Sequence, residues 1–89
     1  MKVVYKYIID DVRQPVYVDI PKGGIILSAG KQLHGPHVLW ALVDPNMERE
    51  YERVIYVAWT GEVLPKEFSW VHISTYTSAG LVYHAFEAL

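Results

Sequence analysis

The feature that most constrains the fold is an uncharged apolar run near the middle of the chain. Residues 38–43 read Val-Leu-Trp-Ala-Leu-Val, and Asp44 and Pro45 follow at once. A short apolar run that ends in a turn signal is typical of a strand covered on both faces, because a half-exposed strand would alternate with polar residues. We therefore expect this segment to be the central strand, with Trp40 in the core.

Six further segments have the composition of short strands, rich in β-branched and aromatic residues and bounded by Gly, Pro, Asn, Asp or Ser. They are residues 3–9, 15–20, 25–29, 51–59, 70–75 and 81–86. In the first of them, Val3, Tyr5, Tyr7 and Ile9 share one side and Lys6 lies on the other. The short link between the last two segments predicts a β-hairpin.

Seven short strands without helical periodicity indicate an all-β fold, either a sandwich or a barrel. The connections are too short for parallel crossovers, so neighbouring strands are expected to be antiparallel. Asp44 as a cap and Pro45 behind it leave room for at most one short helical turn. We expect one domain over residues 1–89.

The chain carries a heavy apolar load for its size. It has 89 residues and no cysteine, and 52% of the residues are hydrophobic. A domain of this size can bury only about 60–65% of the surface of its unfolded chain. Part of the apolar load must then stay at the surface or be covered by a second copy, and we expect a homo-oligomer.

The charge excludes two classes of function. A formal net charge of −2 fits neither the basic footprint of a duplex-binding protein nor the dense acidity of a DNA mimic. The N-terminal residues contain no apolar stretch like that of a signal peptide, and no run reaches the roughly 20 apolar residues of a membrane span. We therefore expect a cytoplasmic protein that does not enter a membrane.

No residue pattern points to catalysis or to a cofactor. Asp10 and Asp11 are adjacent in a polar turn rather than buried as a pair, and no serine lies in a nucleophile-elbow motif. His34 and His37 could converge on a metal, but a zinc site needs further ligands and the chain has no cysteine. We predict no catalytic, cofactor-binding or metal-binding residues, and we expect His84 to be half buried and hydrogen-bonded.

The aromatic residues are the best indication of a binding surface. The chain has seven Tyr, three Trp and two Phe, and rings with one polar end are favoured at protein interfaces. We place Tyr5, Tyr7, Trp59 and Trp70 nearest a binding face. The alternative is a β-barrel module that stacks single-stranded nucleic acid on these rings, with backbone contacts from Lys2, Lys6, Lys22 and Lys31. These few basic residues face ten acidic ones, which favours protein binding.

Several motifs together resemble a small family of uncharacterised proteins encoded by tailed bacteriophages and prophages. They are Tyr5-Lys6-Tyr7, Pro21-Lys22-Gly23 before Ile26-Leu27, residues 39–45, Thr60-Gly61 and residues 80–87. The resemblance implies a phage or prophage gene product in a bacterial cytoplasm, with no reaction, ligand or catalytic residue attached to it. We therefore predict a non-catalytic accessory protein that binds itself, a host protein or both.

Overall fold

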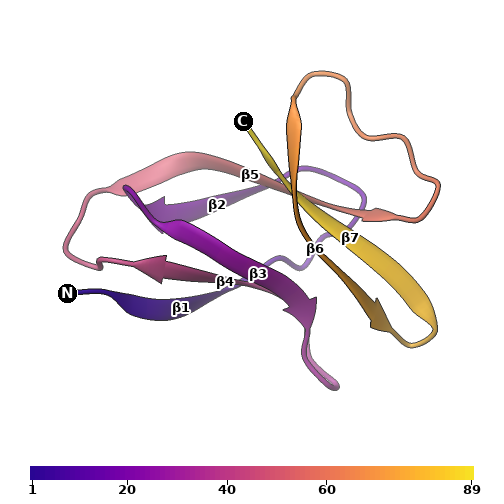
Figure 1. The fold of residues 1–89 in the computed structure, drawn as a ribbon, viewed down its shortest axis with the longest axis horizontal. Coiled ribbons are helices and arrows are strands. Elements are labelled where there is room, and N and C mark those ends of the chain that lie inside the picture. The colour runs from indigo at the N-terminus through magenta and orange to yellow at the C-terminus, as the bar shows by residue number, and fades with distance from the viewer.

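The fold is a sandwich of two antiparallel sheets (Figure 1). The computed structural model describes the backbone of the whole chain and the side chains of residues 1–49 and 53–89. One sheet has the order β1-β4-β3, with β1 at Val3–Ile8, β4 at His37–Val43 and β3 at Ile25–Lys31. The other has the order β2-β5-β7-β6, with β2 at Val16–Pro21, β5 at Arg49–Trp59, β7 at Leu81–Ala88 and β6 at Trp70–Ser78. The expected all-β fold is confirmed, and the described chain contains no helix.

The apolar run at residues 38–43 is the central strand of its sheet, as predicted. β4 pairs with β1 on one side, where Tyr5 faces Ala41, and with β3 on the other. β6 and β7 form the expected hairpin. Its two-residue turn, Ala79 and Gly80, has φ angles of 51° and 81°, as a type I′ turn requires at both central positions.

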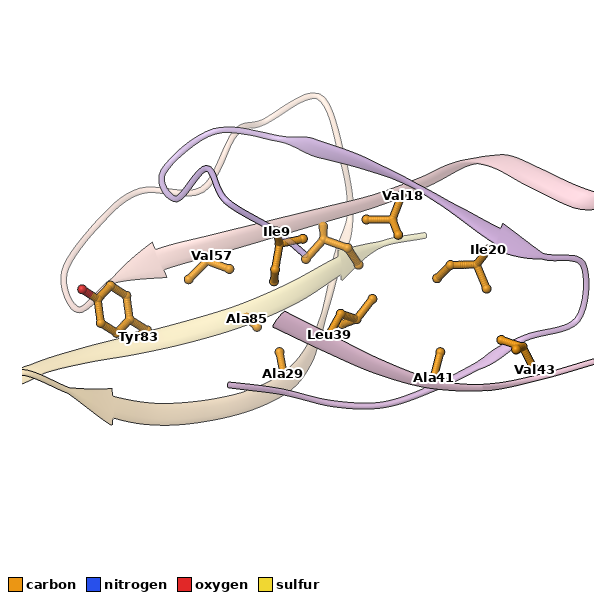
Figure 2. Close-up of a cluster of buried hydrophobic side chains, with 11 residues drawn as sticks. Ile9, Val18, Ile20, Ala29, Leu39, Ala41, Val43, Val57, Tyr83 and Ala85 are labelled. Carbon is orange, nitrogen blue, oxygen red and sulfur yellow. The ribbon is translucent and has the colours of Figure 1, made fainter. Parts of the chain in front are cut away.

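Side chains from the inner faces of both sheets form one core (Figure 2). Its buried members are Ile9, Val18, Ile20, Ala29, Leu39, Ala41, Val43, Ile55, Val57, Tyr83 and Ala85. The strand expected at 15–20 has one buried side: Val18 and Ile20 are buried, whereas Tyr17 is exposed. The core thus uses one face of each sheet.

Trp40 does not belong to this core, which corrects the prediction from the sequence. Leu39 and Ala41 point into the core, whereas Trp40 is half buried on the opposite face of β4. There its ring lies over Gly30, where an added Cβ would meet Cζ3 of Trp40 at 3.4 Å. The molecule measures only 16 Å along its shortest axis, the thickness of two stacked sheets. None of the segments that the structure describes forms a third layer over the outer side of β4.

The connection between β5 and β6 covers part of the outer side of the other sheet. This irregular segment places the centre of the Phe68 ring 5.1 Å from the centre of the Trp70 ring. The Trp70 ring centre in turn lies 5.6 Å from that of Tyr56 on β5. The indole N–H of Trp70 donates to the carbonyl of Pro65 at 2.9 Å. The cover explains why Tyr56 is buried on the outer side of β5, whereas Tyr17 on β2 and Val82 on β7 stay exposed on the same sheet.

Candidate functional site

An exposed apolar surface covers the outer side of the β1-β4-β3 sheet. We call it the outer face and define it as Val4, Ile8, Ile25, Trp40 and Leu42. The strand registers place Val4 and Ile25 on either side of Leu42, and residues directly opposite each other point to the same side of a sheet. Val4, Ile8 and Ile25 are each 51–57% exposed. All three strands therefore contribute aliphatic side chains to one solvent-facing surface.

Lys6 provides the only charge that the described side chains of these three strands add to the outer face. It lies opposite Trp40 in the register of β1 and β4. Its Nζ donates to Oε1 of Gln32 at 3.0 Å, which draws the ammonium group towards the turn between β3 and β4. Ser28 lies opposite Trp40 on the other side of β4, so the middle of the outer face holds the Trp40 ring, the aliphatic stem of Lys6 and one hydroxyl.

Tyr5 and Tyr7 point the other way, into the mouth between the two sheets. Their ring centroids lie 6.5 Å apart. They line a cavity of about 270 Å³ together with Asp19, Pro21, Pro45 and Arg49. Arg49 donates from Nη1 to Oδ2 of Asp19 at 3.0 Å. Burial, and after it the neighbouring Tyr5, raises the pKa of Tyr7. The cavity is below the roughly 300 Å³ at which small-molecule sites begin.

Trp59 and Trp70 lie on the other sheet, away from these tyrosines. Trp59 ends β5, and the guanidinium carbon of Arg13 sits 4.1 Å from the centre of its ring. Trp70 belongs to the aromatic cluster that covers the second sheet, with its N–H already bound to Pro65. The structure thus brings Tyr5 and Tyr7 together and separates them from Trp59 and Trp70.

The histidines do not assemble a metal site. His34 is exposed in a loop, whereas His37 is buried with Nδ1 2.9 Å from the hydroxyl of Tyr76. His84 is half buried, and its Nε2 and Nδ1 lie 2.7 Å from Oγ1 of Thr60 and 3.0 Å from Oγ1 of Thr75, as the sequence predicted. Within the described side chains, no group of three or more His, Cys, Asp or Glu could hold a metal ion.

A family model described as Domain of unknown function (DUF7352) matches residues 1–89 of this chain. The chain belongs to the DUF7352 family. It matches no curated protein and no solved structure. Over the residues that the structure describes, the DUF7352 chain has no helix that is long and apolar enough to cross a membrane.

Reasoning from the sequence missed the outer face of the DUF7352 domain. The alternation over residues 3–9 directs attention to the tyrosines, yet the opposite side of the same strand carries Val4 and Ile8 around Lys6. The second signal is the apolar run of β4, in which Trp40 and Leu42 alternate with core residues. A chain with two apolar faces on one strand and too few residues for a third layer leaves one of those faces exposed.

Proposed function

We propose that the DUF7352 domain is a non-catalytic protein-binding module and that the outer face is its binding surface. The observation that carries this proposal is the set of half-exposed aliphatic side chains, from all three strands, around Trp40. Monomeric proteins rarely expose a contiguous apolar patch of more than a few hundred Å², and larger patches mark interaction sites. Burying such a surface in a protein contact removes apolar area from water, at roughly 25 cal/mol per Å².

The local chemistry favours a protein over a single-stranded nucleic acid. Stacking of bases requires exposed rings beside basic side chains. Tyr5 and Tyr7 instead share their cavity with the ion pair of Asp19 and Arg49, in which the carboxylate offsets the positive charge that a phosphate would need. Among the side chains that the structure describes, Lys6 is the one cation that β1, β3 and β4 add to the outer face, and its ammonium donates to Gln32. An apolar partner surface matches the outer face better than a phosphate backbone does.

The resemblance to proteins of tailed phages and prophages adds a setting to this proposal. In that setting the domain acts in a bacterial cytoplasm, and its partner is a second copy or a host protein. A compact domain without catalysis would act there by occupying a surface of its partner. This part of the proposal rests on the motifs of the sequence.

The test is a pull-down from bacterial lysate with the tagged wild-type chain, an Ile25→Glu variant and a Val63→Glu control. Val63 is 79% exposed in the connection between β5 and β6, away from the outer face. We expect the wild type and the control to retain the same protein after nuclease treatment, and the Ile25→Glu variant to lose it. Equal retention by all three chains contradicts the proposed surface.

The same experiment separates protein binding from nucleic-acid binding. An apolar protein contact changes little between about 50 and 200 mM salt, whereas binding through several phosphate contacts weakens by about 10³-fold or more. Recovery of nucleic acid, with all bound protein lost after nuclease and at raised salt, would favour the nucleic-acid module instead.

A further inference from the structure

The outward edge of β1 offers unpaired backbone groups. The register of β1 and β4 continues beyond the strand, where the N–H of Ile9 donates to the carbonyl of His37 at 2.9 Å. In an antiparallel pair, residues alternate between those that bond to the neighbouring strand and those that point away from it. The N–H and C=O groups of Val4, Lys6 and Ile8 therefore face away from β4. In Figure 1 no other strand is drawn beyond β1.

Two of the other three edge strands close against each other. The hydroxyl of Ser74 on β6 accepts from the N–H of Ala29 on β3 at 2.9 Å and donates to the carbonyl of Ala29 at 2.8 Å. Each of these strands also carries an irregularity in its register, between Ile26 and Ser28 in β3 and between His72 and Ser74 in β6. Neither edge offers a regular template for another strand.

The remaining edge strand, β2, is protected by other means. Pro15 precedes it, Pro21 ends it, and its register shifts between Val18 and Ile20. Proline removes an N–H donor, and a bulge interrupts the ladder that an added strand would need. β1 has neither: its six residues pair with β4 in unbroken register and include no proline. Among the four edges that the structure describes, β1 alone is regular and open.

We propose that β1 pairs antiparallel with β1 of a second copy, so that the two β1-β4-β3 sheets join into one continuous sheet. This inference rests on the proposed function, because β1 is an edge of the sheet that carries the outer face. It names a second copy as the protein that binds there. A symmetric dimer is the simplest assembly for such an edge, because a two-fold axis applies the same contact twice. An edge strand that receives a further strand is an established mode of protein recognition.

The side chains select one register for this pairing. Residues that face each other must point to the same side of the joined sheet, so the two-fold axis passes through a residue. With Lys6 on the axis, Val4 faces Ile8 of the second copy, and Tyr5 faces its Tyr7. Aliphatic and aromatic cross-strand pairs of this kind are stabilising, and symmetry gives each of them twice. With Tyr5 on the axis, Val4 would instead face a lysine.

Charge complementarity supports the same register. With Lys6 on the axis, Lys2 faces Asp10 of the second copy at both ends of the paired strands, and both residues are exposed. The one unfavourable pair is Lys6 with its own symmetry mate, since like charges directly opposite each other repel. The hydrogen bond to Gln32 already draws the Lys6 ammonium away from the edge, which reduces this repulsion.

The backbone of Lys6 allows a specific test. We expect sedimentation equilibrium from about 1 µM to 1 mM, the range suited to a small interface, to show a monomer–dimer equilibrium for the wild type. The Lys6→Pro variant lacks the N–H that faces the open edge but keeps all bonds to β4, so we expect its dimer to be weaker by about 30-fold. The Lys6→Ala control keeps that N–H and removes the repulsion, so we expect its dimer to be at least as tight.

Two further measurements test the register. We expect the amides of Val4, Lys6 and Ile8 to exchange with solvent more slowly as protein concentration rises. Lys2→Glu and Asp10→Lys should each weaken the dimer by about 3- to 10-fold, and the double variant should restore it, because the exchanged charges attract again. Circular dichroism of every variant establishes that the fold is retained.

The outcomes separate this inference from the proposed function. A monomer at all concentrations, or a dimer that Lys6→Pro leaves unchanged, overturns the pairing of β1. A dimer that Ile25→Glu abolishes and Lys6→Pro does not would also overturn it, while supporting the outer face as a binding surface. Loss of the dimer in Lys6→Pro alone, with restoration of binding in the double charge variant, supports the inference.

Discussion

The hydroxyl of Ser74 binds both the N–H and the carbonyl of Ala29, at 2.9 and 2.8 Å, and so connects the two sheets along one side. Replacing Ser74 with alanine leaves a part-buried donor and acceptor without this partner. We expect Ser74→Ala to lower the free energy of unfolding by about 1–3 kcal/mol, measured by urea denaturation at pH 7. Ser69→Ala, at an exposed position, is the control, and an equal effect of both changes would contradict the role of Ser74.

Leu39 and Trp40 are neighbours on β4 that point to opposite sides of the sheet. Leu39 is fully buried in the core, so we expect Leu39→Ala to cost about 3–5 kcal/mol of stability. Trp40 is half buried on the outer face, and the smaller area that it removes from water predicts a loss of about 1–3 kcal/mol for Trp40→Ala. Thermal and urea unfolding of both variants provide the comparison. A larger loss for Trp40→Ala would place its ring in a core that the structure does not show.

His37 makes the stability of the domain depend on pH. Its pKa is lowered from 6.5 by burial and by the nearby charge of Lys31, against a smaller opposing effect of Asp10. The unfolded chain therefore binds a proton at higher pH than the folded chain does. The contribution of His37 to stability is therefore greatest above pH 6.5 and declines as the pH falls below it, until the folded pKa is reached.

Melting temperatures between pH 5 and 8 test this dependence. We expect His37→Gln to flatten the decline below pH 6.5, whereas His34→Gln, in an exposed loop, should leave it unchanged. If the His37→Gln variant lost stability on acidification as steeply as the wild type, another group would be responsible.

Glu62 also stabilises the domain against acid, but over a lower pH range than His37. Burial raises the pKa of Glu62, but hydrogen bonds from Tyr56, the Trp59 N–H and Arg13 outweigh burial and lower it from 4.5. The carboxylate therefore contributes stability above pH 4.5 that is lost as the pH falls through the folded pKa. We expect Glu62→Gln to cost about 1–3 kcal/mol at pH 7 and less at pH 3. Urea denaturation at both pH values checks this, with exposed Glu67→Gln as the control.

The hydrogen bond between Tyr56 and Glu62 also affects the pKa of Tyr56. Burial and the Glu62 carboxylate raise the pKa of the Tyr56 hydroxyl to about 12. A spectrophotometric titration of the wild type and Glu62→Gln should show a tyrosine that ionises at lower pH in the variant. An unchanged titration curve would mean that burial alone sets the pKa.

Local patterns in the sequence predict the strands well but not how they are arranged. The apolar run at residues 38–43 identifies β4 because burial on a central strand requires apolar residues along its length. No local pattern records that β1 pairs with β4, because that pairing joins residues far apart in the chain. The hydrogen bonds between Ser74 and Ala29 cannot be predicted for the same reason. Nothing in the sequence around Ser74 indicates which edge strand its hydroxyl contacts.

The candidate site shows the same limit. Alternation correctly puts Tyr5 and Tyr7 on one side of β1, but it does not reveal that this side faces the mouth between the sheets. The other side, with Val4 and Ile8, becomes part of a larger apolar surface only when β4 and β3 lie beside it. Trp59 contacts Arg13, and Trp70 contacts Pro65. The spacing of these residues in the sequence does not indicate either contact.

The order in which the strands pair has a consequence for the nascent chain. β1 leaves the ribosome before the other six strands, and its partner β4 begins at His37. At about 5–20 residues per second, translation of the intervening segment takes several seconds. Throughout that interval β1 has no neighbour on either side. β1, whose outer edge is open in the finished domain, is thus also the strand that waits longest for its own partner. Neighbouring ribosomes on one message would present several such strands at high local concentration.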